Sequence, residues 1–253
     1  MVKMQFIKTI FIILVTGLVI NACDPEVEVL DETTFGYTYT PLELGKFWIY
    51  KTDSIYFSKE IVVTIDSVSV EIMEEVVDTF RNANNELVFS LDQYLRKDSS
   101  ASWELVGNSF VTSSKSKLIK SEFGLDFIKL VYPVAKNKSW NGNVYIGSRQ
   151  LITFQGEPFE LFSYWNNNSY YYVDIKPKEM ISSGSFENVL SVEEADYTDE
   201  IIKIKSNSKY ADHIGLVYHE AWFLKRGFAN PNTPYDPKAE RGVIIRQYLI
   251  QHN

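Results

Sequence analysis

From about Thr38 to the C-terminus, apolar and polar residues alternate with a period of two, which is the pattern of strands that bury one face. The alternation is clear in Leu87–Asp92 and again in Val243–Leu249. β-Branched and aromatic residues dominate these runs, as strands favour. The pattern therefore predicts strands along nearly all of this region.

Short polar segments separate the apolar runs, and their Asn and Gly residues tolerate the positive φ of tight turns. They include Asn84-Asn85, Gly107-Asn108 and Asn141-Gly142-Asn143. Antiparallel strands at such spacing predict an all-β fold: an antiparallel β-sandwich or a curved, partly closed β-barrel with little helix.

Two segments allow more detailed predictions. Phe159, Leu161 and Trp165 share one parity, and Phe162–Trp165, the Asn triplet 166–168 and Tyr170–Val173 are predicted to form one hairpin. In 61–72 the apolar parity switches at Asp66-Ser67, which predicts a bulge or a turn there.

The first residues have a different character. Lys3 and Lys8 precede an apolar run, Ile10–Ile20, that is too short for a permanent span, because a bilayer core of about 30 Å needs roughly 20 apolar residues. Ile20-Asn21-Ala22-Cys23 follows and resembles a bacterial lipobox. The resemblance implies a signal peptide at 1–22, cleavage between Ala22 and Cys23, and lipidation of Cys23.

The distribution of charged residues predicts a tether after Cys23. The chain has 25 Lys+Arg and 33 Asp+Glu, a net charge of −8, and removal of Lys3 and Lys8 leaves 23 − 33 = −10. Acidic residues cluster directly after Cys23, so residues 23–37 are predicted to be an extended acidic tether. The acidic balance argues against nucleic-acid binding.

The remainder, 38–253, is predicted to be one β-rich domain. Pro41 precedes Trp48 by seven residues, and Pro133 precedes Trp140 by the same step. This echo predicts two related halves that meet near residues 125–132.

The segment Tyr39-Thr40-Pro41-Leu42-Glu43-Leu44-Gly45-Lys46-Phe47-Trp48-Ile49-Tyr50 resembles the Y-x-P-L-x-x-G-x-x-W-x-Y segment of uncharacterised Bacteroidota lipoproteins. Tyr132-Pro133, Trp140-Asn141-Gly142 and Tyr210–Tyr218 resemble the same group, although His213 stands where glycine is common. The resemblance implies an anchored envelope protein, with the outer membrane favoured, and it implies no catalytic residues.

The search for chemistry gives few candidates. Adjacent strand residues point to opposite faces, so His219 and Glu220 cannot serve one metal site. His213 and His252 do not complete a metal-binding pattern, and the single cysteine excludes a multi-cysteine site. No catalytic residue, metal or cofactor is predicted. A carboxylate pair acting in a hydrolase stays an alternative, because sequence cannot show which acids meet in space.

Aromatic side chains are the remaining candidates for binding. Exposed rings beside the polar turn could stack on sugars: Tyr164, Trp165, Tyr170, Tyr171 and Tyr172. The leading hypothesis is a lipid-anchored envelope protein with a non-enzymatic binding or structural role. The alternatives are a carrier that holds a hydrophobic ligand in a LolA/LolB-like half-barrel, and a surface glycan-binding protein. The sequence leaves the oligomeric state open.

Overall fold

The computed structural model describes residues 32–59, 61–122, 124–154, 157–166, 169–182, 184–226 and 239–253. They belong to one compact unit, Glu32–Asn253. Its first elements are two 3-10 turns, η1 (Glu32–Phe35) and η2 (Tyr37–Tyr39). Residues 32–37, expected in the tether, therefore belong to the compact unit.

Strands make up most of this unit. The first six are β1 (Phe47–Lys59), β2 (Val63–Arg81), β3 (Leu87–Arg96), β4 (Glu104–Ser113), β5 (Lys117–Glu122) and β6 (Leu125–Val131). They are followed by β7 (Ser139–Trp140), β8 (Ile152–Phe154), β9 (Glu157–Phe159) and the single helical turn α2 (Phe162–Trp165). The last are β10 (Tyr170–Ile181), β11 (Gly184–Thr198), β12 (Ile202–Ala211), β13 (Gly215–Lys225) and β14 (Arg241–His252).

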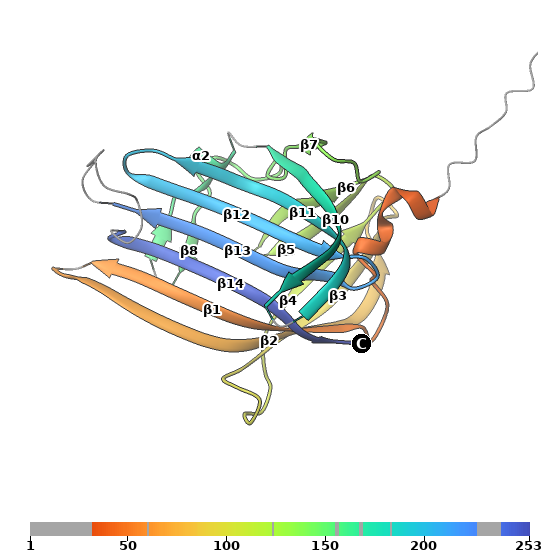
Figure 1. Ribbon diagram of the computed structural model, residues 1–253, viewed down its shortest axis with the longest axis horizontal. Coiled ribbons are helices and arrows are strands. Elements are labelled where there is room, and N and C mark those ends of the chain that lie inside the picture. Colours follow the sequence, from red (N-terminus) through yellow and green to blue (C-terminus); the bar gives the residue numbers. More distant parts are fainter. Residues whose placement is uncertain are drawn as a thin grey trace, which may run out of the picture. The chain divides into compact units, whose positions relative to one another are not determined.

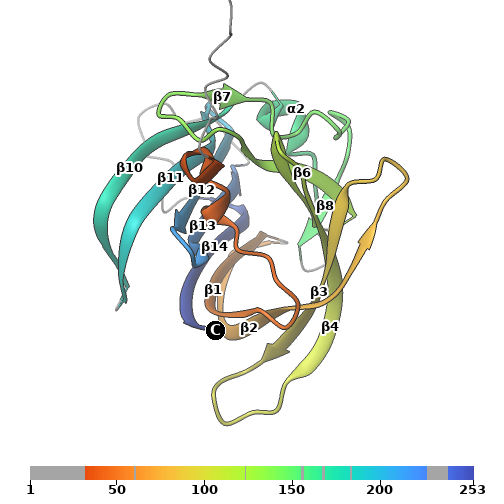
Figure 2. The same ribbon diagram turned by 90° about the vertical axis from the view of Figure 1, so that its right-hand side faces the viewer.

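Twelve strands form one antiparallel sheet in the order β6-β5-β4-β3-β2-β1-β14-β13-β12-β11-β10-β7, while β8 and β9 pair separately. The sheet curls until its two edges touch (Figures 1 and 2). At this seam the Ile128 N–H donates to the Gly142 carbonyl at 2.8 Å, and the Trp140 indole N–H donates to the Ile128 carbonyl at 2.7 Å. The expected curved, partly closed β-barrel is confirmed.

The turns η1 and η2 lie at one end of the barrel, as Figure 2 shows. They bond to the connections that follow β6 and β12. Val134 N–H donates to the Phe35 carbonyl, and His213 N–H donates to the Thr38 carbonyl, each at 2.9 Å. The Tyr39 side chain is buried below them. This end of the barrel is therefore covered by the segment that precedes β1.

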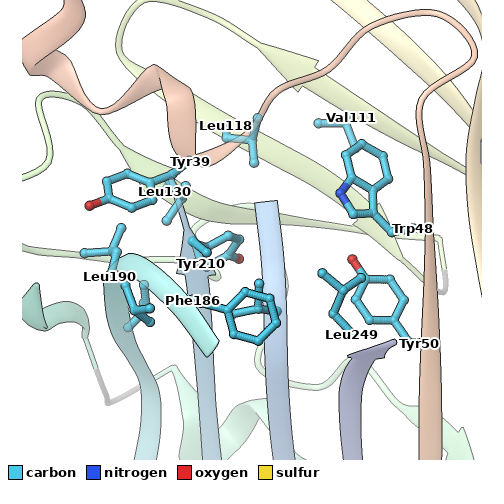
Figure 3. Packing of buried hydrophobic residues seen from close by; sticks show 14 of the residues in the cluster. Tyr39, Trp48, Tyr50, Val111, Leu118, Leu130, Phe186, Leu190, Tyr210 and Leu249 are labelled. Atoms are coloured by element: carbon cyan, nitrogen blue, oxygen red, sulfur yellow. The ribbon is translucent and has the colours of Figure 1, made fainter. Parts of the chain in front are cut away.

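Two apolar cores fill the barrel. The first lies beneath η2, and Figure 3 shows its side chains converging from η2, β1, β4, β5, β6, β11, β12 and β14. The second lies at the end covered by α2 and the β8–β9 pair, around Phe127, Phe162, Trp165 and Phe223. Burial of these large side chains on folding is the main stabilising contribution, at about 25 cal/mol per Å² of apolar surface.

The predicted hairpin at 162–173 is wrong. Residues 162–165 form a helical turn in which Trp165 N–H donates to the Leu161 carbonyl at 3.0 Å. Phe162 and Trp165 are three residues apart, so a helical turn buries both in the second core. The predicted bulge or turn at Asp66-Ser67 is also wrong, because β1 and β2 pair without a register shift through these residues.

Single extra residues interrupt the pairing elsewhere. In the strands that the structure describes, the register skips seven of them: Val77, Val106, Lys129, Val173, Glu194, Val217 and Ile250. Each is a β-bulge, which disrupts the regular alternation of faces. The valines at 77, 106 and 173 and Ile250 are exposed, whereas Lys129 and Glu194 are buried. At six of the seven bulges an apolar residue is therefore exposed or a charged residue is buried, and only at Val217 is the bulge residue apolar and buried.

Candidate functional site

A band of polar side chains lies inside the barrel between the two apolar cores. On β12, Ser206 and Ser208 lie between Ile204 of the second core and Tyr210 of the first. Other strands show the same order: Glu194 follows Val192 of the first core and precedes Ala195 of the second. Alternation along β12 thus places two serines on the inner face, at the level of Glu194.

Five of these side chains form a chain of alternating charge, which we call the ionic network: Glu74, Lys120, Glu122, Lys129 and Glu194. Lys120 Nζ lies 2.7 Å from Glu74 Oε1 and 3.1 Å from Glu122 Oε1. Lys129 Nζ lies 3.3 Å from Glu122 Oε2 and 3.7 Å from Glu194 Oε1. The network therefore joins β2, β5 and β6 to β11 across the interior.

Both ends of the ionic network have uncharged donors. At one end, Gln93 Nε2 donates to Glu74 Oε1 at 2.8 Å. At the other, the Ser206 and Ser208 hydroxyls donate to the two oxygens of Glu194 at 2.6 and 2.7 Å. Glu194 has no exposed surface, so these donors replace the water that the carboxylate loses on folding.

Backbone bulges bring Lys129 and Glu194 into the ionic network. Each is the extra residue of its strand, and a bulge re-aims the side chain that it carries. Both neighbours of Lys129 in sequence, Ile128 and Leu130, are also buried, and Ala195 beside Glu194 is buried. Simple alternation would have turned every second one of these residues outward.

His219 on β13 touches the ionic network through Ser208, since its Nδ1 lies 3.0 Å from the Ser208 Oγ. The Ser208 hydrogen is donated to Glu194, an acceptor, so the oxygen of Ser208 must accept from His219. The hydrogen-bond pattern therefore assigns a proton to Nδ1 and leaves Nε2 as the nitrogen that titrates.

Burial and neighbouring charges set the ionisation of these groups. Burial alone would raise the pKa of Glu122, but Lys129 and Lys120 hold that pKa well below its usual range. Burial alone would lower the pKa of Lys120, but Glu74 and Glu122 raise it. Burial lowers the pKa of His219, which Glu194 offsets only in part. At neutral pH Glu122 and Glu194 are therefore carboxylates, and Lys120 and Lys129 are ammonium groups.

The contact of Ser208, His219 and Glu194 differs from that of an activated nucleophile. A general base accepts the hydroxyl proton of the serine that it activates. Here the Ser208 hydroxyl donates to Glu194, and Ser208 is only 2% exposed. The arrangement holds a buried carboxylate in place and gives a substrate no access to the serine oxygen.

The structure buries most of the aromatic residues considered for binding. Trp165, Tyr170 and Tyr172 are buried, while Tyr164 and Tyr171 are half-buried. The Trp165 indole N–H donates to the Glu194 carbonyl at 2.9 Å, and the Tyr172 hydroxyl bonds to the backbone of Val131. These rings pack in the two cores and at the seam instead of forming an exposed platform.

The remaining candidate residues are Ala22, Cys23, His213 and His252. Ala22 and Cys23 lie outside the described residues, so cleavage and lipidation stay predictions. His213 lies in the β12–β13 turn and His252 at the end of β14, whereas His219 lies within β13 and pairs with Ser208 and Gln247. In the part of the chain that the structure describes, no three His, Cys, Asp or Glu side chains gather as a metal site would require.

Sequence reasoning missed the ionic network. Lys120 and Glu122 do show a signal, since KSKLIKSE alternates and places both on one face with Leu118. Lys129 and Glu194 show none, because the position of a bulge depends on the partner strand. A search for charged residues that share the parity of buried apolar ones would have found Lys120 and Glu122, two of the five members of the ionic network.

Two hollows that the described residues line are small. One, of about 190 Å³, is lined by residues of η1 and η2 together with Val134, Ile175, Asn188 and Asp212. The other, of about 120 Å³, lies between β9, α2, β13 and β14. Both are smaller than the roughly 300–1,000 Å³ of typical small-molecule sites. No helix among the described residues has the length and apolar character needed to cross a membrane.

Comparisons with known proteins give only distant structural likeness. No protein-family description matches the chain, and no curated protein matches it. A candidate exported protein of Bacteroides fragilis with a YmcC-like fold has a TM-score of 0.41 at 11% identity, covering 84% of this chain and 97% of that one. A candidate lipoprotein of Parabacteroides distasonis has a TM-score of 0.41 at 13% identity, covering 87% and 99%. Lipovitellin has a TM-score of 0.33 at 12% identity, covering 83% of this chain and 26% of its own.

Proposed function

We propose that this chain is a lipid-anchored protein of the cell envelope whose β-domain has a non-enzymatic binding or structural role. The anchor is supported by the lipobox-like segment Ile20–Cys23 and by the short apolar run before it. Lipidation of this type attaches several acyl chains, which give stable attachment at about 0.8 kcal/mol per buried CH₂.

One observation supports a binding or structural role over that of a carrier: side chains span the interior of the barrel. The ionic network crosses it from β2 to β11, and an apolar core lies on either side. A carrier of a hydrophobic ligand needs an apolar cavity of ligand size. The interior is therefore better suited to rigidity, which leaves the outer faces and the strand edges for partners.

The anchor is tested by changing its single cysteine. Cells that express the chain are labelled with an alkyne fatty acid and separated into soluble, inner-membrane and outer-membrane fractions. We expect the label and the outer-membrane location in the original chain, and neither in Cys23→Ala. A labelled Cys23→Ala, or an unlabelled original chain in the soluble fraction, would contradict the anchor.

The binding or structural role is tested against the carrier alternative. The chain is purified in detergent, and an organic extract is examined by mass spectrometry for lipid in addition to that on Cys23. We expect no lipid at a stoichiometric amount. A bound lipid that copurifies at one per chain would favour the carrier instead.

The glycan alternative has less support, because Trp165, Tyr170 and Tyr172 present no exposed ring face. Tyr171 is the better probe, since it is half-buried and its loss leaves both cores intact. If Tyr171→Ala lowers retention on an immobilised polysaccharide that the original chain binds, the glycan alternative gains the support that it lacks.

A further inference from the structure

The β1–β2 hairpin reaches beyond the rest of the sheet on the β3 side. β2 pairs with β1 from Val63 to Glu75, whereas β3 joins it only from Glu71 onward. No described residue pairs with the outer edge of 63–70. Figure 1 shows this hairpin as the long orange pair that extends to the left-hand end of the molecule.

This free edge, 63–70, is exposed and rich in apolar residues. Val63, Ile65 and Val68 are 36%, 56% and 42% exposed, and the adjoining Ile61 is 90% exposed. The segment VTIDSVSV is mostly β-branched, contains one charge, and has no lysine or proline. Long, apolar edges of this kind are the ready templates for another strand.

Other free edges of the same sheet are blunted. β10 continues beyond its short pairing with β7, and its free stretch carries Lys176-Pro177-Lys178. Lysine and proline are the usual devices against edge pairing. The free stretch of β4, before its pairing with β5 begins at Phe110, has a bulge at Val106 and then Gly107. The free edge of β2 has no lysine, proline, glycine or bulge, so it differs from the free stretches of β10 and β4.

We propose that this edge is the contact between two copies of the chain, which pair antiparallel through 63–67 about a two-fold axis at Ile65. Opposite residues of an antiparallel pair point to the same face, so a two-fold axis perpendicular to the sheet must pass through a residue pair of equal number. This contact adds a strand to each sheet and bonds the backbone groups that are free in a single copy.

Charge complementarity selects the register. An axis at Asp66 would oppose two carboxylates, which is unfavourable, and an axis at Ser67 would oppose Asp66 to Val68. An axis at Ile65 places Ile65 against its equivalent and Asp66 against the hydroxyl of Thr64. Apolar groups then meet at the centre, and each carboxylate faces a hydroxyl donor.

The proposal is tested by the mass of the full-length protein in detergent, measured by light scattering over a range of concentrations. Ile65→Lys opposes two ammonium groups at the axis and is expected to raise the dimer dissociation constant more than about tenfold. The matched control is Met180→Lys, since Met180 is 66% exposed and lies on the blunted edge of β10. It should leave the dimer unchanged.

Both side chains are exposed, so the circular dichroism spectrum and the denaturation midpoint should be unaltered, which separates lost pairing from lost folding. An original chain that is monomeric at every concentration, or an Ile65→Lys variant that stays dimeric, would overturn the proposal.

The register is tested by oxidation of single-cysteine variants in the Cys23→Ala background, where the new thiol is the only one. Directly opposite residues have Cα atoms about 4.5–5.5 Å apart, which a disulfide can span. Ile65→Cys should cross-link, while Val68→Cys, far from its own equivalent, should not. Faster cross-linking of Val68→Cys would exclude the axis at Ile65. Because this background lacks the anchor, failure of the proposed lipidation leaves this result unaffected.

Discussion

Glu194 is a carboxylate with no exposed surface, held by two hydroxyls and one ammonium group. A glutamine here leaves Lys129 paired with Glu122 alone and turns one serine-bonded oxygen into an NH₂ donor, and loss of a hydrogen bond to a charged group costs about 1.5–3 kcal/mol. We therefore expect Glu194→Gln to lower the free energy of unfolding by that amount in urea denaturation. Glu187→Gln on the same strand is exposed and should change it by less than about 0.5 kcal/mol. Equal effects of the two changes would refute a stabilising role for the ionic network.

His219 predicts how stability depends on pH. Burial lowers its pKa in the folded protein below the unfolded value of about 6.5, so the unfolded state binds the proton more readily. Stability should therefore fall as pH drops below about 6.5. The charged groups around His219 come from three strands: Glu194 on β11, Lys129 on β6, and Glu122 and Lys120 on β5.

A second decline follows at lower pH. Burial alone would raise the pKa of Glu220, but hydrogen bonds from Lys205 and Arg246 hold it at about 2, and the pKa of Glu194 is also lowered. Stability from these carboxylates is complete above their unfolded pKa and is lost as pH falls toward the folded one. Denaturation midpoints measured from pH 8 to 3 should decrease twice: first below about pH 6.5, where His219 gains its proton, and again at lower pH, where the carboxylates gain theirs. His219→Gln should remove only the first decline, and a His219→Gln curve parallel to the original would exclude this assignment.

At the scale of the residue, sequence patterns could not have revealed this site. Lys129 and Glu194 point inward because each is the extra residue of a bulge, and a bulge is defined by the strand opposite. Val106 is exposed for the same reason, although its residue type favours burial. Lys120 and Glu122, in a regularly alternating strand, were open to prediction.

Individual elements show a similar division. The strands around Leu87–Asp92 and Val243–Leu249 are confirmed as β3 and β14, because sustained alternation of apolar and polar residues fits a strand and does not fit a helix. The segment 162–165 was predicted wrongly, since a short apolar run fits a strand or a helical turn equally well. Contacts of Phe162 and Trp165 with the second core decide between the two.

The seam between β6 and β7 gives an element-scale prediction. A Cβ added to Gly142 would lie 2.5 Å from ring atoms of Tyr170, which is fully buried, and Gly142 also accepts the seam hydrogen bond of Ile128. We expect Gly142→Ala to lower the free energy of unfolding by about 1–3 kcal/mol through overpacking. The control is Gly147→Ala in the same connection, where a Cβ would meet nothing within 4 Å. A stability loss in Gly147→Ala as large as in Gly142→Ala would show that the seam is not the cause.

At the scale of the whole molecule, one sheet encloses both apolar cores, and the last strand, β14, pairs with the first, β1. Both cores contain buried residues of β6, β10, β11, β12, β13 and β14, whereas β2, β3, β4 and β5 contribute to the first core alone. Amide hydrogen exchange should therefore give similar opening free energies for β1 near Tyr50 and for β12 near Ile204. A difference of more than about 2 kcal/mol between them would mean that the cores open separately.

The general architecture was accessible from sequence, because an all-β class needs only alternation and turn residues. The choice of a barrel over a sandwich was not, since closure depends on contacts such as Trp140 with Ile128 that join distant segments. The two tryptophans of the Pro–Trp echo both donate their indole N–H to a backbone carbonyl, Trp48 to Ile214 and Trp140 to Ile128. Descent of the two halves from one ancestor stays a prediction.

The bulges also determine where the chain can change length. Deleting a regularly paired strand residue turns every later side chain of that strand to the opposite face. Deleting a bulge residue such as Val106 or Val173 instead restores an unbroken ladder and leaves the flanking residues on their own faces. In a library of single-residue deletions, the surviving variants should therefore concentrate at exposed bulges and at turns. The positions that look most irregular in the structure are those at which evolution could shorten this barrel without refolding it.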